Sequence, residues 1–146
     1  MKSKPSDCVL SQEQGYAVSE GARKVTKNSK YLPFDLHVNG LEIIVTRQVF
    51  DNGGNGIEEL ICPICKHDIS SEDWDFLNDW TKDTRDNITC PLCNGSSEIH
   101  SYTFKPEWGF SNLGFSFWNW PEFQEGFLEE FRDRLASEIN IVYRRV

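Results

Sequence analysis

Hydrophobic and polar residues alternate in short runs along much of this chain, and such alternation is typical of half-buried strands. Apolar residues on either side of Asn39-Gly40, a dipeptide that favours tight turns, predict a hairpin over residues 36–49. The runs IEELICPIC (57–65) and SEIHSYTF (97–104) predict two further strands. The alternating segment INIVYRRV (139–146) predicts a strand that closes the chain.

Two segments instead have apolar residues at helical spacing. Residues 70–82 place Trp74, Leu77 and Trp80 on one side, and Ser70 or Ser71 is expected to cap this helix. Residues 121–137 carry a second stripe, with Asn119 expected as the cap and acidic residues on the rest of the surface. The stripe comprises Phe123, Phe127, Leu128, Phe131 and Leu135.

Four of the five cysteines form two Cys-x-x-Cys pairs, CPIC at Cys62 and Cys65 and CPLC at Cys90 and Cys93. Each pair fits a tight turn that points both sulfurs at one position, and four thiolates are the tetrahedral set that zinc prefers. The 24 residues between the pairs exceed the usual ribbon gap of about 15–20. The first predicted helix accounts for the excess, so the sequence predicts one metal ion held by four cysteines.

The two pairs resemble the knuckles of zinc-ribbon proteins. The resemblance covers residues 58–104 and includes the proline inside each pair and the residues after it, Lys66-His67 and Asn94-Gly95. It implies one zinc ion. Because four cysteines fill the coordination shell, we expect this ion to be structural rather than catalytic.

Together these patterns predict an α+β fold, with a mostly antiparallel sheet, a zinc-ribbon insertion and two helices. Residues 1–30 are expected to form a polar, basic N-terminal arm. Residues 31–146 are expected to form a single α+β domain that contains the zinc-binding insertion at about 58–104.

Other uses of the cysteines stay open. A rubredoxin-type site also uses paired Cys-x-x-Cys, and iron there would imply electron transfer. His67 is an alternative ligand, and Cys8 is either a free thiol or a ligand. A redox pair normally begins a helix of a thioredoxin-like unit, and two equivalent pairs argue against that.

Charge is uneven along the chain, whose formal net charge is −8. Residues 1–30 carry a net charge of +3, whereas residues 31–146 hold nine basic and twenty acidic residues. An acidic field repels phosphates and attracts basic partners, although solubility alone would also explain it. The sequence has no apolar run that could span a bilayer and no secretory signal, so we expect a cytoplasmic protein without membrane association.

Aromatic residues are concentrated in residues 108–120, where six of thirteen positions are aromatic. Stacking of nucleic-acid bases would also need basic residues, but residues 106–131 contain no lysine or arginine and five acids. The pattern therefore argues against nucleic acid. Core packing is the first interpretation of these aromatics, and a protein interface is the second.

No catalytic motif is present, so the sequence predicts a non-catalytic, acidic, zinc-stabilised binding protein with a basic protein partner. In size, charge and lack of catalytic residues it resembles small acidic immunity proteins that neutralise bacterial toxins such as basic nucleases. The alternatives are a zinc-ribbon nucleic-acid or transcription-associated module and an enzyme with an unrecognised site. The candidate partner surface comprises Trp118, Trp120, Glu122, Glu125, Glu129 and Glu130.

Overall fold

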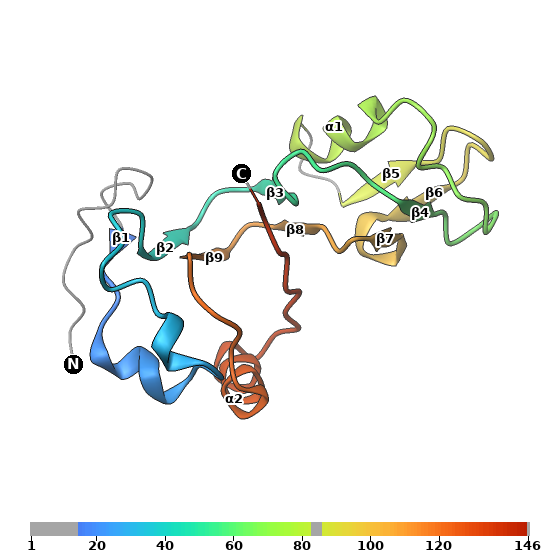
Figure 1. Ribbon diagram of the computed structural model, residues 1–146. Helices are drawn as coiled ribbons and strands as arrows, with labels where there is room; N and C mark the ends of the chain where they lie inside the picture. Colours follow the sequence, from blue (N-terminus) through green and yellow to red (C-terminus); the bar gives the residue numbers. More distant parts are fainter. Residues whose placement is uncertain (1–14, 83–85, 146) are drawn as a thin grey trace. The chain divides into compact units, whose positions relative to one another are not determined.

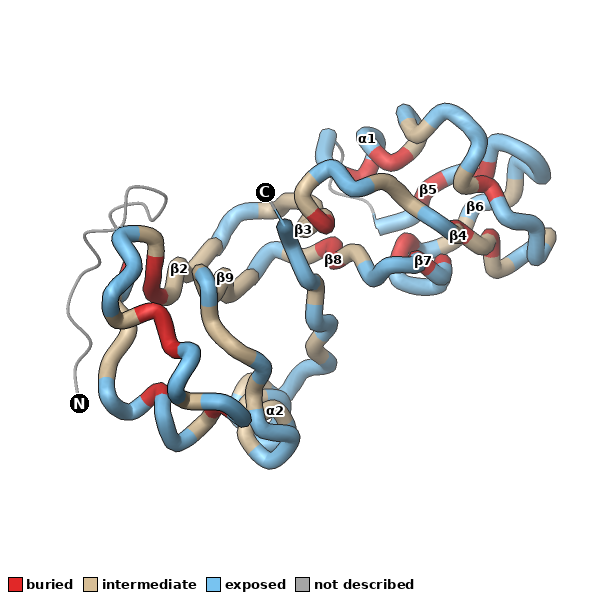
Figure 2. Tube along the Cα trace, in the orientation of Figure 1, coloured by how far each residue is buried: buried red, intermediate tan, exposed pale blue. Residues whose placement is uncertain are grey.

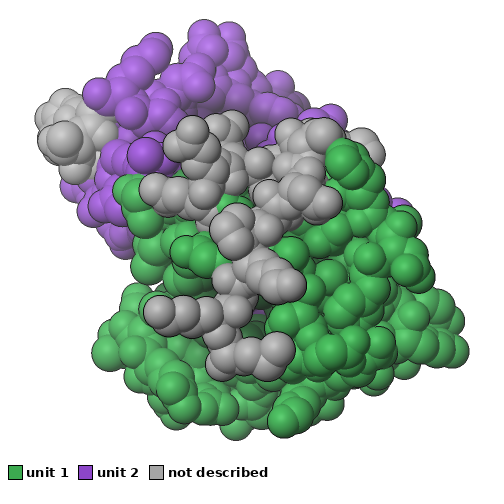
Figure 3. Space-filling model, turned by 90° about the vertical axis from the view of Figure 1, so that its left-hand side faces the viewer, with its two compact units in different colours: residues 1–45, 113–139 green, residues 46–112, 140–146 purple. Residues whose placement is uncertain are grey.

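A computed structural model describes residues 15–82 and 86–145 of the chain (Figure 1). Two α-helices and several antiparallel sheets of short strands confirm the predicted α+β class. The chain forms two compact units, which Figure 3 shows in different colours. Unit 1 comprises residues 1–45 and 113–139, and unit 2 comprises residues 46–112 and 140–146. The hydrophobic pattern gives no sign of this division, and residues 1–14 of the predicted arm lie outside the described residues.

Unit 1 contains a three-stranded antiparallel sheet in the order β1-β2-β9. Its strands are β1 (Gly15–Tyr16), β2 (Gly40–Ile44) and β9 (Gly114–Trp118). The register places Leu41 opposite Phe117 and Ile43 opposite Phe115. The unit also contains two 3-10 helices, η1 (Glu20–Lys24) and η2 (Ser29–Tyr31), and the helix α2 (Glu125–Leu135).

Aromatic side chains join α2 to the sheet of unit 1. Phe115 meets Phe131 edge-on with ring centroids 5.0 Å apart, and Phe117 meets Phe123 edge-on at 4.7 Å. Phe127 contacts both Phe123 and Phe131, so the rings form one continuous row. All five rings are only half-buried. The stripe predicted for the second helix therefore packs on the sheet without forming a fully buried core.

The hairpin predicted around Asn39-Gly40 is wrong. Residues 36–38 form no strand, and β2 begins at Gly40 and pairs with β9, which lies more than seventy residues later in the chain. The Asn39 side chain is buried and donates a hydrogen bond to the Leu36 carbonyl oxygen at 2.6 Å. A backbone φ of 105° at Gly40 turns the chain into β2.

Two predicted element boundaries also differ in the structure. Asn119 has a left-handed φ of 61° and donates a side-chain hydrogen bond to the Val38 carbonyl oxygen, so it forms a turn and not the helix cap. Phe123 is held in a β-bridge with Thr26, and α2 therefore begins only at Glu125. Residues 139–145 form no strand, although the Arg145 amide bonds to the Asn52 carbonyl oxygen at 3.3 Å.

The described residues of unit 2 form three antiparallel strand pairs and one α-helix. The pairs are β3 (Gln48–Phe50) with β8 (Gly109–Ser111), β4 (Glu59–Ile61) with β7 (Thr103–Lys105), and β5 (Asn87–Thr89) with β6 (Ser96–Glu98). The helix α1 (Asp75–Lys82) and a short 3-10 helix, η3 (Ile99–Ser101), complete the unit. Asp73, and neither Ser70 nor Ser71, caps α1, because its Oδ1 accepts the Asp75 amide at 3.0 Å.

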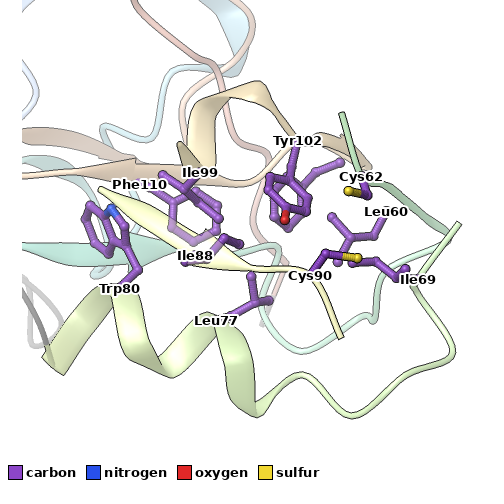
Figure 4. Close-up of a cluster of buried hydrophobic side chains, with 11 residues drawn as sticks. Leu60, Cys62, Ile69, Leu77, Trp80, Ile88, Cys90, Ile99, Tyr102 and Phe110 are labelled. Carbon is purple, nitrogen blue, oxygen red and sulfur yellow. The ribbon is translucent and has the colours of Figure 1, made fainter. Parts of the chain in front are cut away.

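Most of the buried residues belong to unit 2 (Figure 2). As predicted, Leu77 and Trp80 of α1 point into this core, where they are 5% and 1% exposed. Figure 4 shows Trp80 at one end of the cluster and the sulfurs of Cys62 and Cys90 at the other. The core of unit 2 is therefore continuous with its cysteine site.

Candidate metal centre

The first cysteine pair forms a knuckle directly after β4. The Lys66 amide donates to the Cys62 carbonyl oxygen at 3.0 Å, and the Cys62 amide donates to the His67 carbonyl oxygen at 3.2 Å. Lys66 has a φ of 62°, which reverses the chain after the second cysteine. Asp68 holds the base of the knuckle, because its Oδ1 accepts the amides of Leu60 and Ser70 at 3.0 and 2.9 Å.

The second pair repeats this geometry between β5 and β6. The Asn94 amide donates to the Cys90 carbonyl oxygen at 2.9 Å, and the Cys90 amide donates to the Gly95 carbonyl oxygen at 2.9 Å. Asn94 has a φ of 59°, matching Lys66 in the first knuckle. Two hairpin turns with the same hydrogen bonds therefore present the cysteines in the same way, as the zinc-ribbon resemblance implies.

The structure brings all four predicted ligands together. The sulfurs of Cys62, Cys65, Cys90 and Cys93 lie within 4.8 Å of one another, and those of Cys62 and Cys93 are 3.9 Å apart. All four thiols are free, with no disulfide between them. Four sulfurs at such distances can surround a single metal ion, so this cluster can hold one.

Backbone amides and burial act on the thiols in opposite directions. Burial opposes ionisation of Cys62, but amide hydrogen bonds from Cys65 and Ile64 bring its pKa down to about 6. Burial dominates at Cys90 and raises its pKa to about 11, despite amides from Cys93 and Leu92. Neighbouring thiolates repel one another, and a bound cation would offset this repulsion and the cost of burial.

Tyr102 and Gly95 lie beside the sulfurs and are not among the predicted ligands. Tyr102 is 5% exposed, and burial together with the negative charge of Cys62 raises the pKa of its phenol. Gly95 leaves room for the knuckles to approach, since a Cβ there would lie 2.5 Å from Ile64 Cδ1 and 3.2 Å from Cys93 Sγ. A glycine two residues past the second pair was the sequence signal for this packing.

The sequence left His67 and Cys8 open as alternative ligands. Within the described ranges, the metal-ligating cluster consists of the four cysteines and does not include His67. The backbone of His67 nevertheless serves the site, because its carbonyl oxygen bonds the Cys62 amide. Cys8 lies outside the described residues.

The predicted partner surface lies on unit 1, on β9, α2 and the segment between them. Glu122 pairs with Lys27 at 3.3 Å, and Glu130 pairs with Arg134 at 2.6 Å. Glu125 and Glu129 are exposed, and the described residues form no ion pair with either. The two tryptophans are half-buried: the Trp118 indole donates to Glu42, and the Trp120 ring packs edge-on against Phe117 at 5.1 Å.

Comparisons of this chain with protein-family models, curated proteins and solved structures gave no match. Among the described residues, no helix has the length and apolar character needed to cross a membrane. Any function of this chain is therefore inferred from the cysteine centre and from the surfaces of the two units.

Proposed function

We propose that one structural zinc ion holds unit 2 together and that the protein works by binding a basic protein partner, without catalysis. The observation that carries the proposal is the cluster of four sulfurs within 4.8 Å of one another on two matching knuckles. Four thiolates complete a tetrahedral shell and leave no open position for substrate or water. The same donor set would also bind iron, so the metal itself is part of the proposal.

The acidic surface of α2 supports the choice of partner. Glu125 and Glu129 are one helical turn apart, so they lie on the same face of α2. Neither has an ion-pair partner among the described residues, in contrast to Glu122 and Glu130. Their charges would speed association with a basic surface. An immunity-type inhibitor of a basic toxin, such as a nuclease, in the reducing cytoplasm would have these properties.

The zinc proposal is tested by metal analysis of the purified full chain. We expect one zinc ion per chain, and we expect Cys65→Ser to lower both zinc content and thermal stability because one ligand is lost. Cys8→Ser is the matched control and should change neither. Iron at the site, or a Cys65→Ser variant that is as stable as the parent, would contradict the proposal.

The binding proposal is tested by affinity capture with the zinc-loaded chain, followed by reconstitution with the purified captured protein. We expect a basic protein whose affinity falls with salt and falls further in the double variant Glu125→Lys/Glu129→Lys. Glu58→Lys/Glu107→Lys makes the same charge change at exposed positions on unit 2 and is the control. Retention of nucleic acid instead of a basic protein would favour the zinc-ribbon nucleic-acid module.

A further inference from the structure

Unit 2 has a hollow of about 450 Å³ beside α1. This volume falls in the range of ligand pockets, roughly 300–1,000 Å³. Its lining combines apolar side chains with carboxylates. The apolar part comprises Val49, Trp74, Leu77 and Trp108, and the carboxylates are Asp51, Asp73 and Asp75.

Two indole rings form a corner in this lining. The rings of Trp74 and Trp108 lie nearly perpendicular, at 80°, with centroids 6.1 Å apart. Phe104 stacks on Trp108 at 5.9 Å, and the Trp74 indole donates to the Ser70 carbonyl oxygen at 2.8 Å. Both rings are therefore held in place by other contacts. Indole faces carry partial negative charge and attract cations.

The carboxylates differ in how far their charge is already compensated. Asp51 lies 4.0 Å from the Arg144 guanidinium and also accepts the Gly53 amide. Asp73 and Asp75 have no ion pair among the described residues. Their hydrogen bonds within the described residues are local: Asp73 accepts the Asp75 amide, and one oxygen of Asp75 accepts from the Asn78 side chain at 3.3 Å. Each keeps a second carboxylate oxygen for an incoming donor.

We propose that this hollow binds the guanidinium group of an arginine side chain contributed by the basic partner. A planar guanidinium stacks on an indole face and at the same time donates paired hydrogen bonds to carboxylates, which a lysine ammonium does less well. This proposal depends on the proposed function in one respect: the arginine is taken to belong to a protein partner. The chemical preference follows from the tryptophans and aspartates alone.

The test is an NMR titration of the zinc-loaded full chain with L-argininamide, after assignment of the five indole N–H signals. We expect saturable shifts of the Trp74 and Trp108 signals and none for Trp118 or Trp120. L-citrullinamide, which has nearly the same shape and no charge on its side chain, should bind at least about fivefold more weakly. Equal shifts with both compounds, or no shift with argininamide, would overturn the proposal.

Variants then test which carboxylates bind the guanidinium group. Asp73→Asn/Asp75→Asn should weaken argininamide binding about fivefold or more, while an asparagine at 73 can still cap α1. Asp35→Asn/Asp133→Asn, at exposed positions of unit 1 outside the predicted partner surface, is the control and should leave argininamide binding unchanged. Undiminished binding in the first variant contradicts the proposal. Because argininamide replaces the partner, these results are independent of whether a basic protein is captured.

Discussion

The guanidinium carbon of Arg47 lies over the Trp80 ring, 3.7 Å from its centroid, and the Arg47 Nε donates to the Trp80 carbonyl oxygen at 2.8 Å. An Nη atom of the same side chain pairs with Asp86 at 3.0 Å. Trp80 is at the end of the unit 2 core opposite the sulfurs (Figure 4). Arg47 therefore covers one end of a core whose other end is the cysteine centre.

Replacing Arg47 by methionine should lower the free energy of unfolding by about 2 kcal/mol. Methionine keeps a long apolar stem over the indole but removes the cation and the hydrogen bond to the carbonyl oxygen. Urea unfolding of the zinc-loaded protein measures the change. Arg134→Met removes an arginine that is exposed on α2 and paired with Glu130, and it should cost no more than about 0.5 kcal/mol. Equal effects of both substitutions would argue against a special role for Arg47.

Chelation of the metal should affect the tryptophans of the two units differently. Trp74, Trp80 and Trp108 belong to unit 2, and Trp118 and Trp120 belong to unit 1, whose described residues contribute no ligand to the cluster. We expect EDTA to broaden or shift the first three indole N–H signals because the core around the knuckles loosens without the ion. The other two signals serve as internal controls. Five unchanged signals after complete metal removal would show that the ion is not structural.

His100 has an acceptor at each ring nitrogen. Its Nδ1 bonds the Glu98 carboxylate, and its Nε2 lies 2.7 Å from the Phe110 carbonyl oxygen. Both nitrogens must donate to satisfy these acceptors, which requires the imidazolium form. Burial lowers the pKa of His100, but the bonds to Glu98 and Phe110 and the charge of Asp86 outweigh it and raise the pKa above 6.5.

This arrangement predicts a loss of stability with rising pH. The folded-state pKa of His100 is raised, so its contribution is fully present below pH 6.5 and is lost as the pH rises through the folded pKa. From pH 6.5 upwards, the urea concentration at the unfolding midpoint should fall less steeply with pH in His100→Gln than in the parent. His37→Gln, at an exposed position, is the control. An NMR titration that places the His100 pKa at or below 6.5 would contradict the assignment.

Two glycines should respond to alanine in opposite directions. A Cβ at Gly126, in the first turn of α2, would have nothing within 4 Å, so Gly126→Ala should stabilise the protein by about 0.5 kcal/mol. At Gly53, φ is 83° and a Cβ would lie 2.0 Å from the Arg145 carbonyl oxygen. Gly53→Ala should therefore destabilise by at least about 1 kcal/mol. Thermal melting of both variants checks the two signs.

Local signals account for what could be predicted from the sequence. The apolar spacing of Leu77 and Trp80 sufficed for the existence of α1, since residues three apart share a helix face, although the helix begins at Asp75 and not after Ser70 or Ser71. The start of α2 could not be predicted in the same way. The Thr26–Phe123 bridge and the Asn119 bond to Val38 keep residues 119–123 out of the helix, and both join residues about eighty or more positions apart. No window of neighbouring residues contains that information.

The sequence by itself determined the four-cysteine set, because each Cys-x-x-Cys turn forms from adjacent residues and needs no distant contact to aim its sulfurs. Only the tertiary structure decided which strands pair with β2 and that Trp74 meets Trp108 beside two aspartates. Aromatic residues look alike in the hydrophobic pattern whether they fill a core or line a hollow. Their role depends on the long-range strand pairing that sets their neighbours.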